Sequence, residues 1–242
     1  MDITGRQAHI LTALIREYIR AAEPVGSEPL VTRQHLPYSP ATVRSEFSVL
    51  EEEGYVEQPH TSAGRIPTGR GYRYFVDRMA TRPLSATEFR AVHEELRALR
   101  AERERLARKA AKLLASLTGQ VAVTGIADTE EIQEAGLPDL LEEPEFSGGE
   151  HVRDLSRVLE AFDAHVRELA SIIDDVPRVY IGDENPFAAT QHISCVIAPC
   201  RFPSGEHGFL AIVGPLRMRY DRAMSLLAST AEFLSHVRGG SR

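Results

Sequence analysis

Residues 37–70 constrain the possible fold of this chain more than any other segment. Ser39 followed by Pro40 favours a helix start, because a serine hydroxyl can cap the first turn and proline fits the first helical position. Gly54, directly after three glutamates, indicates where that helix ends. A short strand over 55–58, a tip of small residues and a return strand near 65–66 follow. This order predicts a short helix beside a basic hairpin.

The segment before it predicts two more helices. Apolar residues recur at helical spacing from Ile10 to Ile19, which indicates an amphipathic helix over about 5–22. Ser27 then caps a short second helix, and a turn over 35–38 leads to the third. A further helix begins at Thr68. Three helices followed by a β-hairpin are the pattern of a winged helix-turn-helix, and we predict such a domain over 1–82.

A long helix is expected over 85–117. Its apolar residues alternate at spacings of three and four, which favours a coiled-coil seam between two subunits. A single amphipathic helix docked on its own C-terminal domain would show the same stripe, so both interpretations stay open. We assign 83–118 as a linker and dimerisation helix, with these candidate contacts: Phe89, Val92, Leu96, Leu99, Leu106, Leu113 and Leu117.

The remaining chain, 119–242, has the pattern of a mixed domain. Strands are expected over 121–126, 178–182, 193–198 and 208–213, and helices over about 150–173 and 220–237. The stretch 128–150 holds nine acidic residues and no basic one, so we expect a solvated loop there. Helices beside an antiparallel-type sheet make this an α+β domain, and α+β is the fold class predicted for the chain.

Charge is spread unevenly along the 242 residues. The formal net charge is −7, yet residues 60–82 hold five arginines against one aspartate, whereas 121–242 carry a net charge of −10. An anionic polymer is therefore expected to meet the first region and to be repelled by the second. The hydrophobic fraction of 43% and the charged fraction of 26% are those of an ordinary soluble protein.

Several features indicate a cytoplasmic protein. No apolar run approaches the roughly 20 residues that span a bilayer. The N-terminus has no basic-then-apolar signal sequence, so export is not expected. Cys195 and Cys200 lie in an apolar stretch, where buried and reduced thiols are expected.

The helix that follows Ser39 is expected to have two distinct faces. Val43, Phe47 and Leu50 are spaced to pack inward. At about 100° per residue, the outward face and its flanks then hold small polar residues and an arginine: Ala41, Thr42, Arg44, Ser45 and Ser48. Such a face suits a helix that enters the major groove of DNA, where Arg44 could pair with a guanine edge or bind a phosphate. The same face could also be solvated without a partner.

The hairpin adds hydrogen-bond donors without bulk. Thr61, Ser62 and Arg65 offer hydroxyl, backbone and guanidinium donors, as contact with phosphate or entry into the minor groove requires. Helix and hairpin together predict a DNA interface, with these contacts: Ser39, Thr42, Arg44, Ser45, Ser48, Thr61, Ser62, Arg65, Arg70 and Arg73.

Enzyme signatures are absent from the sequence. It contains no Gly-x-x-x-x-Gly-Lys-Ser/Thr loop, no His-Glu-x-x-His and no Gly-x-Ser-x-Gly. His192, Cys195, Cys200 and His207 lie near one another in the sequence, but their spacing matches no standard zinc pattern. We therefore expect no catalytic residues, no metal site and no cofactor.

Several motifs resemble those of the heat-inducible transcription repressor HrcA family. In the first 80 residues they are Glu-Pro-Val-Gly-Ser at 23–27, Ser-Pro-Ala-Thr-Val-Arg at 39–44, Leu-Glu-Glu-Glu-Gly-Tyr at 50–55, Pro-His-Thr-Ser-Ala-Gly-Arg-Ile-Pro-Thr at 59–68 and Gly-Tyr-Arg-Tyr at 71–74. Two later stretches are similar to the family's C-terminal GAF-like domain: Ile-Gly-Asp-Glu-Asn-Pro at 181–186 and Val-Gly-Pro-Leu-Arg-Met-Arg-Tyr at 213–220.

The resemblance implies a homodimer that binds an inverted-repeat DNA operator upstream of chaperone operons. It would repress them until heat, or titration by the chaperonin, inactivates it, with the C-terminal domain over 119–242 as a marginally stable switch. One alternative is a paralogous regulator of other genes whose GAF-like domain senses a small molecule. Another is a protein-interaction module that uses the 85–117 helix and has lost DNA binding, although the five arginines over 60–82 argue against it.

Two departures from the family pattern affect these expectations. Family members usually carry an inserted dimerising domain, which the stretch 125–144 replaces here, so the 85–117 helix gains importance for dimerisation. The family also usually has Asn-Glu-Met where this chain has Ser45, Glu46 and Phe47. Asparagine can pair bidentately with adenine and serine cannot, so we expect a changed operator preference.

Overall fold

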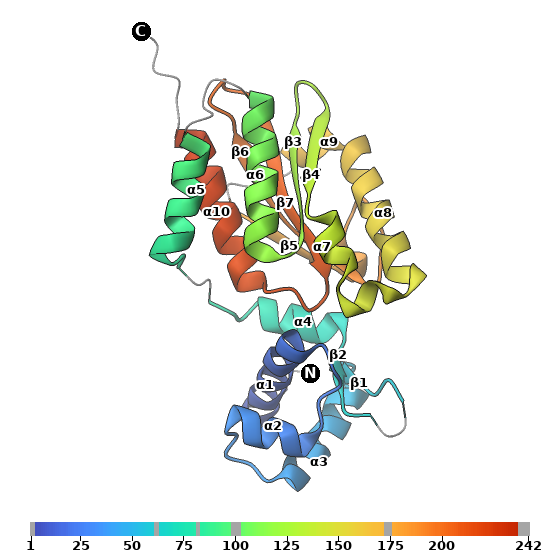
Figure 1. The fold of residues 1–242 in the computed structure, drawn as a ribbon. Coiled ribbons are helices and arrows are strands. Elements are labelled where there is room, and N and C mark those ends of the chain that lie inside the picture. Colours follow the sequence, from blue (N-terminus) through green and yellow to red (C-terminus); the bar gives the residue numbers. More distant parts are fainter. Residues whose placement is uncertain (1–2, 61–62, 81–82, 98–102, 172–175, 237–242) are drawn as a thin grey trace. The chain divides into compact units, whose positions relative to one another are not determined.

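The computed structural model describes residues 3–60, 63–80, 83–97, 103–171 and 176–236. The chain divides into two compact units, unit 1 (Met1–Met79) and unit 2 (Ala80–Arg242). The mixed helix and sheet content predicted from the sequence is confirmed, and each unit has its own sheet (Figure 1). None of the helices within the described ranges is long and apolar enough to cross a membrane.

The described part of unit 1 contains three helices, a short hairpin and a further helix. In chain order these are α1 (Gly5–Ala21), α2 (Ser27–Gln34), α3 (Pro40–Glu52), β1 (Val56–Glu57), β2 (Ile66–Pro67) and α4 (Gly69–Val76). Capping explains two of the helix starts: Ser39 Oγ accepts the Thr42 N–H at 3.1 Å, and Thr68 Oγ1 accepts the Gly71 N–H at 3.2 Å. Gly54 follows α3 with a φ of +73°, a conformation that costs glycine little.

The connection between α1 and α2 pairs with the hairpin. Val25 and Arg65 exchange two backbone hydrogen bonds, of 3.0 Å from the Val25 N–H and 2.9 Å from the Arg65 N–H. Gly64 permits this approach, because a Cβ there would lie only 2.3 Å from the Val25 carbonyl carbon. Two motifs that are far apart in the sequence, at 23–27 and 59–68, therefore form one paired structure.

Unit 2 is built on a five-stranded antiparallel sheet with the order β4-β3-β7-β6-β5. Its strands are β3 (Val121–Ile126), β4 (Glu131–Ala135), β5 (Arg178–Ile181), β6 (Ile193–Arg201) and β7 (His207–Pro215). The longest pairing joins β6 to β7, from Ile193 opposite Pro215 to Arg201 opposite His207. The strands predicted over 121–126, 178–182, 193–198 and 208–213 are thus confirmed.

Helices cover both faces of this sheet. The helices of one layer are α5 (Ala86–Arg97), α6 (Arg103–Thr118) and α10 (Tyr220–His236), and those of the other are α8 (Gly149–Ala164) and α9 (Val166–Ser171), as Figure 1 shows. Neighbouring residues of β6 reflect the two layers: Ser194 Oγ lies 2.8 Å from the Tyr220 hydroxyl of α10, whereas Cys195 belongs to the core that includes Phe162 of α8. The helix expected over about 150–173 is divided in two at His165.

The prediction of a single long helix over 85–117 is wrong. The described residues form two helices, α5 and α6, which pack against each other (Figure 1). Helix α6 also packs on β3 and β4, and α5 packs on α10. An amphipathic stripe indicates that one face is buried but not what buries it. Here much of that stripe is covered by the sheet and helices of unit 2.

The solvated loop predicted over 128–150 is also wrong. This stretch contains β4, α7 (Leu137–Leu141) and a 3₁₀ turn, η1 (Pro144–Ser147). Leu140 and Phe146 are buried in the core of unit 2. Glu143 and Glu145 both form ion pairs with Arg217, so two of the acids that suggested solvation hold the segment against the loop before α10.

Candidate nucleic-acid interface

Helix α3 has the two faces that its sequence predicts. Val43, Phe47 and Leu50 are buried, with exposed fractions of 0%, 4% and 0%. The opposite face is exposed over Ala41, Arg44, Ser45 and Ser48. The Arg44 side chain makes no hydrogen bond or ion pair with any residue in the described ranges. An outward row of small polar residues beside an available guanidinium can approach the base edges of a DNA groove closely.

Ser39 and Thr42 lie at the N-terminal end of this face. Besides accepting the Thr42 N–H, Ser39 Oγ lies 2.9 Å from Thr42 Oγ1. The two hydroxyls therefore stabilise the start of α3, and Ser39 remains exposed. The free backbone N–H groups at the N-terminus of a helix, together with nearby hydroxyl side chains, can also bind phosphate oxygens.

Glu46 fixes α3 against the beginning of α1. Its carboxylate is buried, forms an ion pair with Arg6 Nε at 2.6 Å and accepts a hydrogen bond from Gln7 Nε2 at 3.0 Å. Sequence reasoning missed this role. The available signal was an acidic residue directly beside Phe47 on the inward side of an amphipathic helix, a position that requires a polar partner.

Arg65 holds the hairpin against α3. Its guanidinium donates to Glu51 Oε2 at 2.8 Å, and only 16% of its side chain is exposed. Its backbone pairs with Val25. The structure thus places Arg65 in the attachment of the hairpin, whereas the sequence suggested a donor at the tip. Thr61 and Ser62, the other expected tip donors, lie outside the described residues.

Arg70 and Arg73 lie on α4 and are engaged within unit 1. Arg70 is exposed, donates to the Glu53 carbonyl at 2.6 Å and lies over the Tyr55 ring at 4.4 Å from its centroid. It therefore joins α4 to the end of α3 while keeping part of its guanidinium open to solvent. Arg73 pairs with Asp77 at 3.3 Å.

A buried carboxylate joins α1 to α2. Glu17 is 1% exposed and accepts hydrogen bonds from Arg20 at 2.5 Å, Arg33 at 2.8 Å and Gln34 at 3.0 Å. The hydrogen bond from Arg20 contributes most to lowering the pKa of Glu17 to about 2. Sequence reasoning missed this carboxylate too, because Arg33 and Gln34 reach it only after α2 has packed on α1.

The seven candidate dimerisation residues do not share one environment. Val92, Leu106 and Leu113 are buried inside unit 2, and Leu117 is partly buried. Phe89 is 51% exposed. Leu99 and the side chain of Leu96 lie outside the described part of the chain. The assignment of this set to a dimer interface stays a prediction, and Phe89 is the described member that is open to a partner.

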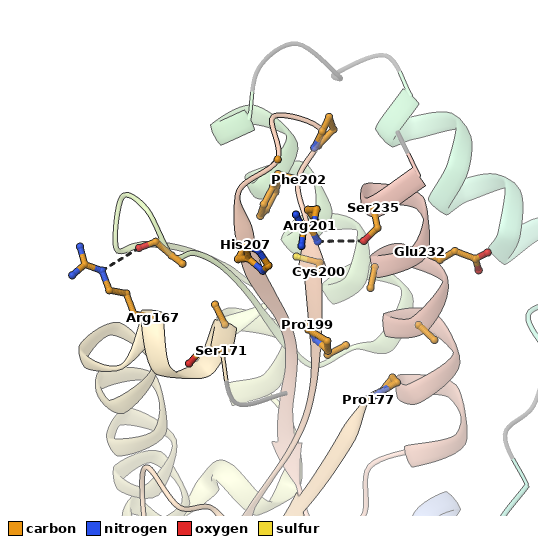
Figure 2. Close-up of a pocket in the computed structure, with 17 residues that line it drawn as sticks. Arg167, Ser171, Pro177, Pro199, Cys200, Arg201, Phe202, His207, Glu232 and Ser235 are labelled. Carbon is orange, nitrogen blue, oxygen red and sulfur yellow. Dashed lines mark hydrogen bonds between the residues drawn. The ribbon is translucent and has the colours of Figure 1, made fainter. Parts of the chain in front are cut away.

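Unit 2 also has an open cavity of about 1150 Å³. It lies at the turn between β6 and β7 and extends between α9 and α10, with Pro177, Pro199 and Phe202 among its lining residues (Figure 2). Cys200 lines it as well, and burial raises the pKa of this thiol. Cys195 and Cys200 are both buried and free, as the sequence predicts. Within the described ranges, no three His, Cys, Asp or Glu side chains are grouped to hold a metal ion.

The fold and this surface define a class of protein with two units. One is a small helical unit with a hairpin and an exposed polar helix face, and the other is an α+β unit built on a five-stranded antiparallel sheet. The family described as "HrcA protein C terminal domain" matches residues 72–224, and the chain belongs to the HrcA family.

Curated relatives carry the name heat-inducible transcription repressor HrcA. The one from Cutibacterium acnes is 50% identical over 122 residues, which are 50% of this chain and 36% of the relative. The one from Acidothermus cellulolyticus is 50% identical over 119 residues, 49% of this chain and 35% of the relative. The matched part of the chain thus spans about a third of the length of these relatives.

One solved structure shares the fold of the chain. It is described as a hypothetical protein at 2.2 Å resolution and superposes with a TM-score of 0.72, covering 98% of this chain and 100% of its own. Its sequence identity of 18% supports a common fold alone.

Proposed function

We propose that this chain is a sequence-specific DNA-binding repressor of transcription, with no enzymatic activity. Its targets would be heat-shock chaperone operons, bound through an inverted-repeat operator and released on heat stress. The curated relatives bear the name of such repressors. The observation that carries the proposal is the exposed face of α3, where Arg44, Ser45 and Ser48 lie opposite a fully buried apolar face.

In this proposal unit 1 is a winged helix-turn-helix domain. Helix α3 enters the major groove, and the β1–β2 hairpin lies against the neighbouring backbone as the wing. Arg44 reads a base edge or holds a phosphate, whereas Arg65 positions the wing through Glu51. Unit 2 is a GAF-like regulatory domain, and two copies of the chain bind the two half-sites of the operator. The chaperonin is a candidate modulator of unit 2.

The two arginines provide the test, because their environments differ. Arg44→Ala should weaken binding to an operator fragment about tenfold or more, since a good contact to a guanine edge is worth about 1–3 kcal/mol. It should leave thermal stability unchanged, because the side chain is exposed and makes no hydrogen bond or ion pair within the described residues. Arg65→Ala should weaken binding and also lower the melting temperature, because Glu51 loses its partner.

Fluorescence anisotropy at fixed salt, beside a melting curve for each variant, measures both effects. The DNA would be the upstream regions of the chaperone operons, with a shuffled fragment as the control. Arg16→Ala is a matched control, since Arg16 is exposed on α1 and makes no hydrogen bond or ion pair within the described ranges. Operator affinity that stays unchanged in both the Arg44 and the Arg65 variants would remove the assigned interface.

The cavity in unit 2 favours a second candidate, a related regulator of other genes that senses a small molecule. Its volume of about 1150 Å³ is somewhat larger than the roughly 300–1,000 Å³ of most ligand sites, so a small molecule would fit. This candidate predicts that a metabolite raises the melting temperature of the chain while heat alone leaves DNA binding intact. The heat-shock repressor predicts that no metabolite raises the melting temperature and that heat alone releases the DNA. A metabolite screen, followed by measurement of DNA binding at raised temperature, separates the two candidates.

A further inference from the structure

Val49 is an exposed apolar residue on the face of α3 that carries the proposed function. It is 38% exposed, and the other large hydrophobic residues exposed within the described ranges lie in unit 2. Burial within unit 1 therefore does not account for its apolar side chain. Sequence reasoning passed over Val49, because valine beside Leu50 looks like part of the core.

The neighbours of Val49 place it in the row that faces outward. Ser45 precedes it by four residues and so lies one helical turn away on the same side. Both Ser45 and Ser48 are exposed. Ser48 Oγ donates to the Arg44 carbonyl at 3.4 Å, which partly satisfies that hydroxyl within the helix. The row therefore offers a guanidinium, two small hydroxyl side chains and one branched apolar side chain.

The major groove contains an apolar group that suits such a side chain. Of the four bases, only thymine presents a methyl group there, at C5, and apolar side chains distinguish it by contact. Burying a surface valine lowers the free energy only when it packs against another apolar group. Against phosphates or the polar edges of the other bases, it would bury polar groups without giving them a hydrogen-bond partner.

We infer that Val49 contacts the C5-methyl group of a thymine in each half-site and so helps to set the operator sequence. The inference rests on the proposed function, since it requires α3 to lie in the major groove. It adds a specificity-determining residue to Arg44 and the two serines. It also specifies the chemistry that is read, a methyl group rather than a hydrogen-bonding edge.

The test removes the apolar group from each partner in turn: the C5-methyl group of thymine, and the two γ-methyl groups of Val49. Binding sites are first selected from a randomised DNA pool with the full chain, and each thymine of the selected site is then replaced by deoxyuridine. At one thymine position per half-site, deoxyuridine should weaken wild-type binding about fourfold, the value of one buried methyl or methylene group. Val49→Ala should weaken binding to the thymine site by a similar factor.

The decisive result is the coupling between the two changes. If Val49 meets the methyl group, Val49→Ala should bind the thymine and deoxyuridine sites equally. A Ser45→Ala variant serves as the matched control, because it truncates a neighbour on the same face and should retain the loss at deoxyuridine. Wild-type and Val49→Ala proteins that show the same deoxyuridine effect at every position would overturn the inference. Failure of the wild-type chain to select any sequence would overturn the proposed function itself.

Discussion

At the scale of single residues, close backbone contact explains two glycines of unit 1. A Cβ at Gly64 would lie 2.3 Å from the carbonyl carbon of Val25 and 2.4 Å from its oxygen. A Cβ at Gly71 would lie 2.3 Å from the Tyr55 oxygen. The sequence suggested only a flexible tip at Gly64, whereas the structure gives it a packing role. These obstacles are backbone atoms, which cannot move aside as the end of a long side chain can.

We therefore expect Gly64→Ala to destabilise unit 1 by about 2 kcal/mol or more, as overpacking does in well-packed regions. The two hydrogen bonds between Val25 and Arg65 would lengthen or break, and the hairpin would lose its attachment. A thermal melt followed by circular dichroism measures the loss of stability. Affinity for an operator fragment should fall as well, because the hairpin no longer holds its place beside α3.

Gly5→Ala is the matched control for this substitution. Gly5 is the first residue of α1, and a Cβ there would meet nothing within 4 Å. Alanine also favours the helix over glycine. This variant should melt at the wild-type temperature or slightly above it. A Gly64→Ala protein as stable as Gly5→Ala would show that the space around Gly64 is not restrictive.

At the scale of elements, Glu17 makes the packing of α1 on α2 dependent on pH. Its folded-state pKa of about 2 lies below the ordinary value of 4.5, so the folded chain binds this proton more weakly than the unfolded chain does. The stability that Glu17 contributes is therefore fully present above pH 4.5 and is lost as the pH falls toward 2. Glu17→Gln should lower stability by about 1–3 kcal/mol near pH 7, because charged hydrogen bonds are replaced by neutral ones.

Melting curves recorded from neutral pH down to the pKa of Glu17 test this expectation. The difference between wild type and Glu17→Gln should be largest near neutral pH and should shrink steadily in acid. Glu23→Gln alters an exposed carboxylate in the connection after α1 and should show no such trend. A constant difference across the whole range would mean that the charge of Glu17 is not what stabilises the helix pair.

The elements of unit 1 could be predicted from the sequence because their signals are local. Ser39 and Thr68 cap their own helices, and Gly54 ends α3 through its own φ. The errors arose where distant residues decide the outcome. Helix α7 and its neighbours over 128–150 depend on Arg217, and α5 packs on α10, which lies near the other end of the chain.

The same distinction applies to the candidate site. The outward face of α3 follows from helical period alone, and the burial of Val43, Phe47 and Leu50 agrees with it. The role of Arg65 in attaching the hairpin could not be predicted from a local sequence pattern. Its partner Glu51 and its backbone contact with Val25 come from two other parts of unit 1, and the sequence shows only an arginine near a hairpin tip.

At the scale of the whole molecule, a dimer needs a surface that the fold leaves open. The ring of Phe89 stacks on His93 at 4.0 Å between centroids, and His93 meets Phe233 of α10 edge to face at 4.9 Å. These contacts hold Phe89 in place on α5 while half of its surface stays exposed. A fixed, exposed aromatic ring is typical of a residue that dominates binding in a protein interface. Val92, one turn along, is buried and supports the fold instead.

We expect Phe89→Ala to raise the dimer dissociation constant thirtyfold or more, because truncating such an aromatic residue typically costs about 2 kcal/mol or more. Sedimentation velocity over a range of concentrations would measure the change. Leu141→Ala is the control, since Leu141 is a comparably exposed apolar residue on α7 and should leave association unchanged. The Phe89 variant should also no longer bind DNA with two half-sites more tightly than DNA with one. That difference in affinity requires two associated copies of the chain, each with its own α3. A Phe89→Ala protein that dimerises like wild type would show that Phe89 is not part of the dimer interface.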